Sequence, residues 1–198
     1  MGKRLAVFTN TFPYGKGETF LEDEINFTAQ EFGKVDIFPL YIPQGSEGET
    51  VRNVPQNVTV HPPLLRGDHK DKNTLLKDGL LNFAPIGFAV KEFIGKKIYS
   101  NSKKIWLWGS YLCTLRSILG NRERMREVRQ VLEECSVAYF YWGDKSALAV
   151  PFLKKKLKRT PAFVVRFHGS DVYEQAKGVK CQKFIIKPNQ EKTPPKER

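Results

Sequence analysis

Cysteine is scarce in this sequence, and its few copies form no recognisable pattern. Cys113, Cys135 and Cys181 are an odd number of residues with no close spacing. This arrangement is unsuited to a disulfide framework or a cysteine-based metal site, and it favours thiols that stay reduced. The apolar run near the start, Leu5 to Phe8, is too short for a signal peptide. We therefore expect a cytoplasmic protein.

Long apolar runs and the common catalytic motifs are also missing. No stretch of about 20 apolar residues is present, so no helix is predicted to span a bilayer. The sequence contains no His-Glu-x-x-His motif, no acidic metal cluster and no Gly-x-Ser-x-Gly elbow. It also lacks both the G-x-G-x-x-G fingerprint and the Walker A loop. We expect neither a bound metal nor a resident cofactor.

Acidic residues are outnumbered by basic ones. The chain has 33 Lys and Arg against 21 Asp and Glu, a net charge of +12, which attracts phosphate, nucleic acid or anionic lipid headgroups. Nucleic acid is the least favoured partner, because no zinc-finger spacing, basic-zipper pattern or aromatic RNA-binding motif is present. Residues 177–198 carry seven Lys or Arg against two Glu and have little periodicity. We predict that this segment is a disordered basic tail.

What the sequence does contain is a regular alternation of strands and helices. Short apolar runs at 5–9, 35–41, 58–61, 137–142 and 163–167 are typical of strands in a parallel sheet. Between the first two runs, apolar residues from Phe20 to Phe32 repeat at helical spacing, and we expect Gly33 to end that helix. This order implies right-handed crossovers. The sequence therefore predicts an α/β fold over residues 1–176, with one open, Rossmann-like, mostly parallel sheet and flanking helices.

Residues 74–131 are almost entirely helical in pattern and form a predicted insertion in this domain. From Leu80 to Leu112, aromatic and aliphatic residues are interleaved with five lysines. These are Lys91, Lys96, Lys97, Lys103 and Lys104. Helices that cover a sheet expose lysines on their outer face in this way. A helix in a membrane interface uses the same pattern to reach headgroups, and the sequence leaves both interpretations open.

Two loops that follow predicted strands contain candidate binding residues, because ligands of open α/β sheets bind where the strands end. In the loop from Thr9 to Thr19, Gly15 and Gly17 allow close approach of a ligand to the backbone, and the next helix offers N–H groups to an anion. This loop has a second interpretation, as a turn that merely requires glycine.

The second loop follows the last predicted strand and begins Arg166-Phe167-His168-Gly169-Ser170-Asp171. His168 is able to hydrogen-bond a sugar hydroxyl or a phosphate, and Asp171 to orient it or to cap a helix. A lone histidine in this position is equally compatible with a structural role.

Taken together, the two loops resemble those of family 4 glycosyltransferases, retaining enzymes of the GT-B fold. The first match is Phe-Pro-Tyr-Gly-Lys-Gly-Glu-Thr-Phe-Leu-Glu-Asp-Glu-Ile at 12–25, and the second is Val-Arg-Phe-His-Gly-Ser-Asp-Val-Tyr-Glu at 165–174. The resemblance covers roughly residues 3–176 and identifies them with the N-terminal, acceptor-side domain of such an enzyme.

The resemblance implies transfer of a sugar from a nucleotide-sugar to a glycan or lipid-linked acceptor, without a metal. By this analogy, Gly15 and Gly17 line the cleft beside the donor phosphates. His168 is the expected catalytic residue, in contact with a hydroxyl of the transferred sugar. The other residues expected to bind substrate are Lys16, Glu18, Arg166, Gly169 and Asp171, the last of which supports the loop.

The sequence departs from the family after residue 176, where a donor-binding domain with paired glutamates is expected. Residues 178–198 match nothing in that domain, which predicts a truncated chain that is inactive alone or that depends on a separate donor-domain chain. A basic acceptor domain also suits peripheral contact with the inner face of an anionic membrane. The main alternative is a non-catalytic α/β binding module for an anionic partner, either a membrane surface or nucleic acid. A stand-alone nucleotide binder is less favoured, because no acid follows the second strand to hold a ribose.

Overall fold

The computed structural model describes residues 3–43, 45–46, 52–65, 86–143 and 145–168. Its centre is a five-stranded sheet in the order β3-β2-β1-β4-β5, in which every neighbouring pair is parallel. The strands are β1 (Arg4–Thr9), β2 (Lys34–Pro39), β3 (Val58–Val60), β4 (Val137–Phe140) and β5 (Ala162–Val165). The predicted Rossmann-like α/β fold is confirmed, and the central strand is the first one in the chain.

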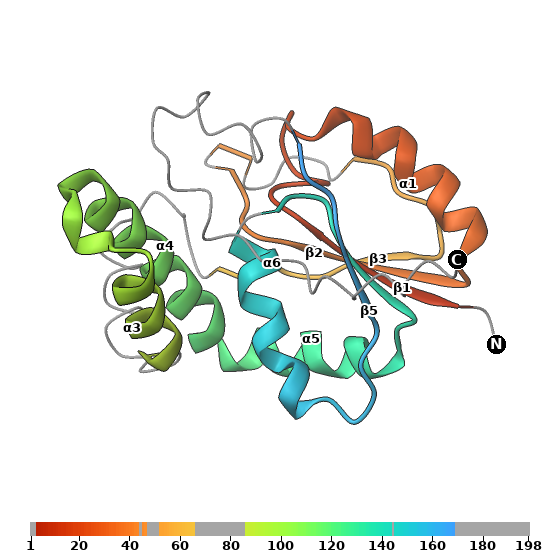
Figure 1. The fold of residues 1–198 in the computed structure, drawn as a ribbon. Helices are drawn as coiled ribbons and strands as arrows, with labels where there is room; N and C mark the ends of the chain where they lie inside the picture. The colour runs from red at the N-terminus through yellow and green to blue at the C-terminus, as the bar shows by residue number, and fades with distance from the viewer. Residues whose placement is uncertain (1–2, 44, 47–51, 66–85, 144, 169–198) are drawn as a thin grey trace, which may run out of the picture.

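One face of the sheet is covered by helix α1 (Thr19–Glu31), as Figure 1 shows. Leu21, Ile25 and Ala29 lie one helical turn apart and are buried against the sheet, which is the packing that the sequence periodicity predicts. The helix ends directly before Gly33, as predicted, but not through a left-handed glycine. Phe32 already adopts an extended backbone (φ −116°), and Gly33 does not have a positive φ.

The opposite face is covered by α5 (Arg122–Glu134), α6 (Lys145–Ala149) and the 3₁₀ helix η2 (Val150–Lys156). Val128 and Leu132 of α5 are fully buried against this face, while Arg126 points to solvent. The result is a three-layer arrangement of helix, sheet and helix around two apolar cores.

A row of flat rings crosses this second face from one edge of the sheet to the other. Phe8 of β1 stacks on Phe38 of β2 at 5.3 Å and on Phe140 of β4 at 4.7 Å between ring centroids. The row continues from Phe38 to His61, after β3, at 4.2 Å and from Phe140 to Phe163 of β5 at 6.0 Å. Each strand or its end contributes one ring, so a one-residue slip of any strand would move its ring to the other face.

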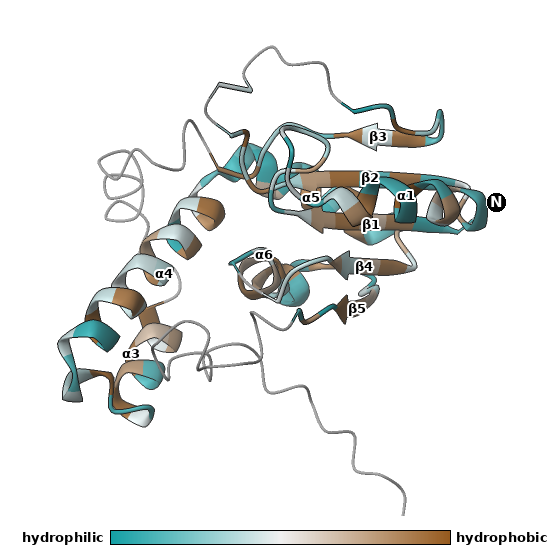
Figure 2. Ribbon diagram, turned by 90° about the horizontal axis from the view of Figure 1, so that it is seen from above, coloured by the Kyte–Doolittle hydropathy of each residue, from teal (hydrophilic) through white to brown (hydrophobic). Residues whose placement is uncertain are grey.

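The predicted helical insertion falls partly outside the described residues, which resume at residue 86. From there the chain forms α3 (Ile86–Gly95), the 3₁₀ helix η1 (Ile98–Ser100), α4 (Ser102–Gly120) and then α5. The C-terminal half of α4 is packed against the body through Leu115 and Ile118, whereas α3 and the N-terminal half of α4 project from it (Figure 2). Within the described ranges, no helix is long and apolar enough to cross a membrane.

A buried ion cluster joins the first three strands of the sheet. The Asp36 carboxylate is completely buried and accepts hydrogen bonds from Arg4 Nε at 2.7 Å, Arg4 Nη2 at 3.0 Å and His61 Nε2 at 2.8 Å. Burial alone would raise the pKa of Asp36, but the hydrogen bonds from His61 and Arg4 outweigh it and hold the pKa at about 2. His61, for which the sequence predicts no role, therefore has a structural one.

We predict that Asp36→Asn lowers the free energy of unfolding by about 3 kcal/mol, because it leaves the Arg4 charge without its buried partner. The wild-type contribution is complete above about pH 4, the ordinary range of an aspartate. It is lost as the pH falls toward the folded-state pKa of about 2. Urea unfolding at a series of pH values measures both effects. The control is Glu134→Gln, which removes an exposed partner of the same Arg4 and should lower the free energy of unfolding by less than about 1 kcal/mol. If the two variants lose the same amount of stability, the prediction is contradicted.

Candidate functional site

The predicted site residues that the structure describes lie at the edge where the parallel strands end. The chain runs from β1 to β2 in one direction across the sheet and reaches β4 on the other side of β1. The gap between the ends of β1 and β4 is therefore the point where the strand order reverses, which is the usual ligand position in open α/β sheets. The loops after β1, β4 and β5 all meet there.

The Glu18 carboxylate organises the loop after β1. Its Oε2 accepts hydrogen bonds from the backbone N–H groups of Thr11 and Phe12, both at 2.7 Å, and from Thr11 Oγ1 at 3.2 Å. Its Oε1 accepts from Asn10 N at 2.9 Å and from the indole Nε1 of Trp142, after β4, at 2.7 Å. A carboxylate that accepts several N–H groups is held strongly. These amides are used by the protein itself, so an incoming anion must bind other groups.

The backbone around Glu18 is bent to make these contacts. Glu18 is the N-cap of α1 and has a left-handed conformation (φ 56°), which is unfavourable for a residue with a side chain. Gly15 is also left-handed (φ 65°), and a Cβ there would meet the Pro43 ring at 3.0 Å. Both observations indicate that the loop is held in one shape by its surroundings.

Arg52, in the segment that precedes β3, also holds this loop. Its guanidinium donates to the carbonyl oxygen of Gly15 at 3.1 Å and 2.6 Å from two nitrogens, and also to the carbonyl oxygen of Gly17. The guanidinium carbon lies 5.4 Å from the centroid of the Phe12 ring, within cation–π range. Arg52 thus places a fixed positive charge beside the two glycines.

His168 is held by the end of β4. Its Nε2 lies 2.9 Å from the carbonyl oxygen of Tyr141, and because a carbonyl only accepts, Nε2 carries the hydrogen. Its ring centroid lies 4.1 Å from that of Trp142 and 5.0 Å from that of Tyr141. Trp142 therefore connects the two predicted motifs, with its indole nitrogen on Glu18 and its ring face against His168.

Arg166 takes part in a second polar group on the same face of the sheet. Its Nη1 donates to Glu24 Oε2 at 2.6 Å, and its guanidinium lies over the ring of Tyr141 at 5.1 Å. Tyr139 donates its hydroxyl to Glu24 Oε1 at 3.0 Å. A hydrogen bond with Tyr139, followed by the bond to Glu24, raises the pKa of Arg166, while burial raises the pKa of Tyr139. Arg166 is therefore a fixed cation that faces partly to solvent.

Gly143 allows the loop after β5 to lie close to the loop after β4. A Cβ atom at position 143 would lie 2.5 Å from two carbons of the Phe167 ring, which is far shorter than any real contact. Phe167 lies between Arg166 and His168 in the chain. Its close contact with Gly143 therefore fixes the positions of Arg166 and His168.

The structure describes six of the eight predicted site residues. Glu18, Arg166 and His168 lie on the same side of the sheet edge, and Gly15 and Gly17 present their carbonyls to Arg52. The Lys16 side chain is exposed. Gly169 and Asp171 lie outside the described residues, as does the predicted tail at 177–198.

Three residues at the site were missed by the sequence analysis: Arg52, Trp142 and Glu24. Arg52 lies in a region that the sequence marks only as a loop, and Trp142 was counted only as the end of a strand. Glu24 lies within the first motif at 12–25 but is not among the predicted site residues. A tryptophan directly after a buried strand was the one available indication of a site, because the carboxyl edge is where ligands bind.

The chemistry available here is recognition of a polar ligand. Among the described residues, no group of three or more His, Cys, Asp or Glu is placed to hold a metal ion. The site offers a histidine held against an indole, two exposed or half-exposed cations at Lys16 and Arg166, and a glycine loop. Such groups bind hydroxyls and anions.

Comparison of the chain with family models, with curated proteins and with solved structures finds no match. Its function must therefore be inferred from the site residues and from the resemblance of the two loop motifs.

We predict that Glu18→Gln lowers the free energy of unfolding by about 2 kcal/mol, since one end of the amide becomes a donor that faces other donors. The indole N–H resonance of Trp142 should shift in the same variant. Urea unfolding and NMR check these two effects. The control is Glu22→Gln, whose carboxylate is half exposed and makes one long contact, at 3.3 Å, with Arg52. If the two variants unfold alike and leave the indole resonance unchanged, Glu18 does not organise the loop.

We predict that Gly143→Ala displaces Phe167 and shifts the NMR resonances of His168 and Trp142, with a loss of about 1–3 kcal/mol of stability from overpacking. Gly109→Ala in α4 is the matched control, because a Cβ there meets nothing within 4 Å. Alanine in a helix interior should raise stability by up to about 1 kcal/mol. A stable Gly143→Ala protein with unshifted resonances would contradict the packing described above.

Proposed function

We propose that this chain is the acceptor-side domain of a retaining glycosyltransferase, which transfers a sugar from a nucleotide-sugar to a glycan or lipid-linked acceptor. One observation carries the proposal. The two motifs that resemble family 4 glycosyltransferases are 150 residues apart, at Glu18 and His168, yet they are joined through the single side chain of Trp142. A shared contact of this kind is expected of residues that serve one site.

The local chemistry supports this role. His168 is held by its Nε2–H on Tyr141 and by its face on Trp142, so the imidazole is pre-oriented to contact a hydroxyl of the transferred sugar. Gly15 and Gly17 permit the donor phosphates to approach the backbone. The positive charge of Arg52, bound to both glycine carbonyls, offsets the negative charge of those phosphates.

Arg166 has a separate part in the proposal. Its ion pair with Glu24 and its position over Tyr141 hold it half exposed beside His168. From there it contacts the acceptor or the donor phosphate through a planar, bidentate guanidinium. The proposal requires no metal ion, because Arg52 and Arg166 provide positive charge for the donor phosphates.

A donor-binding domain completes the enzyme in this proposal, either in another chain or in another part of a longer protein. Alone, the described domain binds the substrates weakly and does not turn them over, because the donor lacks most of its binding groups. We place the protein in the cytoplasm at the inner face of the membrane, where a lipid-linked acceptor is accessible.

The test is a titration of the full chain with UDP-, GDP-, ADP- and dTDP-linked hexoses at millimolar concentrations, followed by ¹H–¹⁵N NMR. We expect shifts at Gly15, Gly17, the Trp142 indole and His168 for at least one of these donors. His168→Phe keeps a flat ring against Trp142 but has no ring nitrogens, and it should reduce the effect of the sugar while leaving the effect of the nucleoside diphosphate unchanged. The matched control, Arg129→Gln on α5, lies on the opposite face of the sheet and should bind as the wild type does.

Shifts that are absent for every nucleotide-sugar, or that occur only away from the carboxyl edge, would contradict the proposal. Such a result would favour a non-catalytic binding module. Binding that is equally strong for hexose-free nucleotides and unaffected by His168→Phe would contradict the role of His168.

A further inference from the structure

Exposed apolar side chains are concentrated on the projecting helical hairpin formed by α3, η1 and the first turns of α4. Among the described residues, ten large hydrophobic side chains are exposed, and six of them belong to residues 86–106. The six are Ile86, Val90, Ile94, Tyr99, Ile105 and Trp106. An exposed cluster of this kind marks an interaction site in a globular protein.

The exposed residues follow the helical repeat. Ile86, Val90 and Ile94 are spaced by four residues, so they form one stripe along α3, and they are 44%, 49% and 62% exposed. The inner side of the hairpin has its own apolar contacts, in which Phe93 packs on Trp108 at 5.0 Å. The outer stripe is therefore not needed to hold the two helices together.

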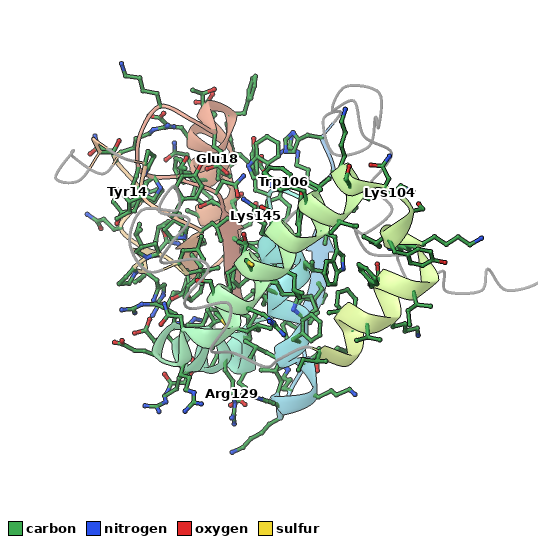
Figure 3. All side chains as sticks on the ribbon, turned by 90° about the vertical axis from the view of Figure 1, so that its left-hand side faces the viewer. Tyr14, Glu18, Lys104, Trp106, Arg129 and Lys145 are labelled. Atoms are coloured by element: carbon green, nitrogen blue, oxygen red, sulfur yellow. The ribbon has the colours of Figure 1, made fainter. Side chains whose placement is uncertain are left out.

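Lysines surround the apolar residues. Residues 86–106 contain five Lys and one Glu, and that Glu is paired with Lys96 at 2.6 Å. Lys91, Lys97 and Lys103 are exposed. Trp106 is the most exposed residue of the group at 70%, and with Ser102, Lys103 and Leu107 it lines a hollow of about 480 Å³. Figure 3 views the hairpin from outside, with Trp106 and Lys104 labelled on α4.

The hairpin lies on the same side of the protein as the candidate site. Helices α3 and α4 project on the side where the parallel strands end, which is also the side of the candidate site (Figure 1). Helix α4 is anchored by its buried C-terminal half, including Leu115 and Ile118, so its N-terminal half is presented on a fixed support.

We propose that this hairpin docks the protein on an anionic phospholipid bilayer, with the apolar residues in the interface and the lysines on the headgroups. Tryptophan and tyrosine prefer this depth, and lysine stems lie along apolar surface while the amines reach phosphate. Nucleic acid does not suit the surface, because the aliphatic stripe on α3 has no partner on a phosphate backbone. The basic segment 177–198 does not suit it either, because its charge has the same sign as that of the hairpin. The inference is independent of the proposed catalytic role.

The test is co-sedimentation of the full chain with vesicles of phosphatidylcholine alone, or with one third of that lipid replaced by phosphatidylglycerol. We expect binding to the anionic vesicles at about 0.1 M salt and a large loss at about 1 M salt. The triple variant Lys97→Gln, Lys103→Gln, Lys104→Gln should bind about a hundredfold more weakly, since each lysine contributes about fivefold. Its matched control neutralises Lys154, Lys155 and Lys156, which form an exposed basic run at the end of η2.

Apolar insertion is tested separately. Ile94→Ser with Trp106→Ala should weaken binding at least tenfold, and Trp106→Phe should retain most of it. Phe27→Ala on α1 is the control, because Phe27 is equally exposed at 70% but lies outside the hairpin.

The outcomes that overturn the proposal are distinct. They are no binding to anionic vesicles at any salt, an equal loss in the Lys154–156 control, or no effect of the Ile94 and Trp106 substitutions. A change of oligomeric state in the hairpin variants without a change in vesicle binding would identify the surface as a contact between copies of the chain, and would also overturn it.

Discussion

The candidate site depends on one half-buried negative charge, the carboxylate of Glu18. Its two oxygens join the end of β1, the start of α1 and the end of β4, because they accept from Asn10, Thr11, Phe12 and Trp142 at once. Without that charge, the donors in the loop after β1 would have no common acceptor, and the indole that supports His168 would lose its anchor. The Glu18 carboxylate thus occupies the loop amides as a bound anion would. Its shape is set before any ligand arrives, which lowers the entropic cost of binding.

Most of the fold was accessible from the sequence because buried parallel strands and amphipathic helices have strong local patterns. The apolar run from Leu5 to Thr9 and the helical repeat around Ile25 are patterns of this kind, and both correspond to elements of the structure. Helix α1 ends directly before Gly33, as predicted, but the extended backbone of Phe32 ends it and not a left-handed glycine. Helix ends depend on where the next strand must begin, and that is set by pairing with a distant segment.

The site was less accessible, because its contacts join residues far apart in the chain. Glu18 and His168 were predicted from their motifs, but Trp142, which links them, has no motif of its own. The same applies to Arg52, which reaches back 37 residues to Gly15. A side chain's role in such contacts depends on strand order, and the sequence does not specify which strand lies beside β1.

The position of β1 has a consequence for the synthesis of the protein. β1 is the central strand of the sheet and leaves the ribosome well before its partner β4, which begins only at Val137. At about 5–20 residues per second, roughly 6–25 seconds pass between the completion of β1 and the appearance of β4. During that time one edge of an apolar strand has no partner, and an open edge is a template for other chains. The nascent chain is therefore most prone to aggregate, through the open edge of β1, before β4 is synthesised. Chaperones that cover this edge would act in that interval.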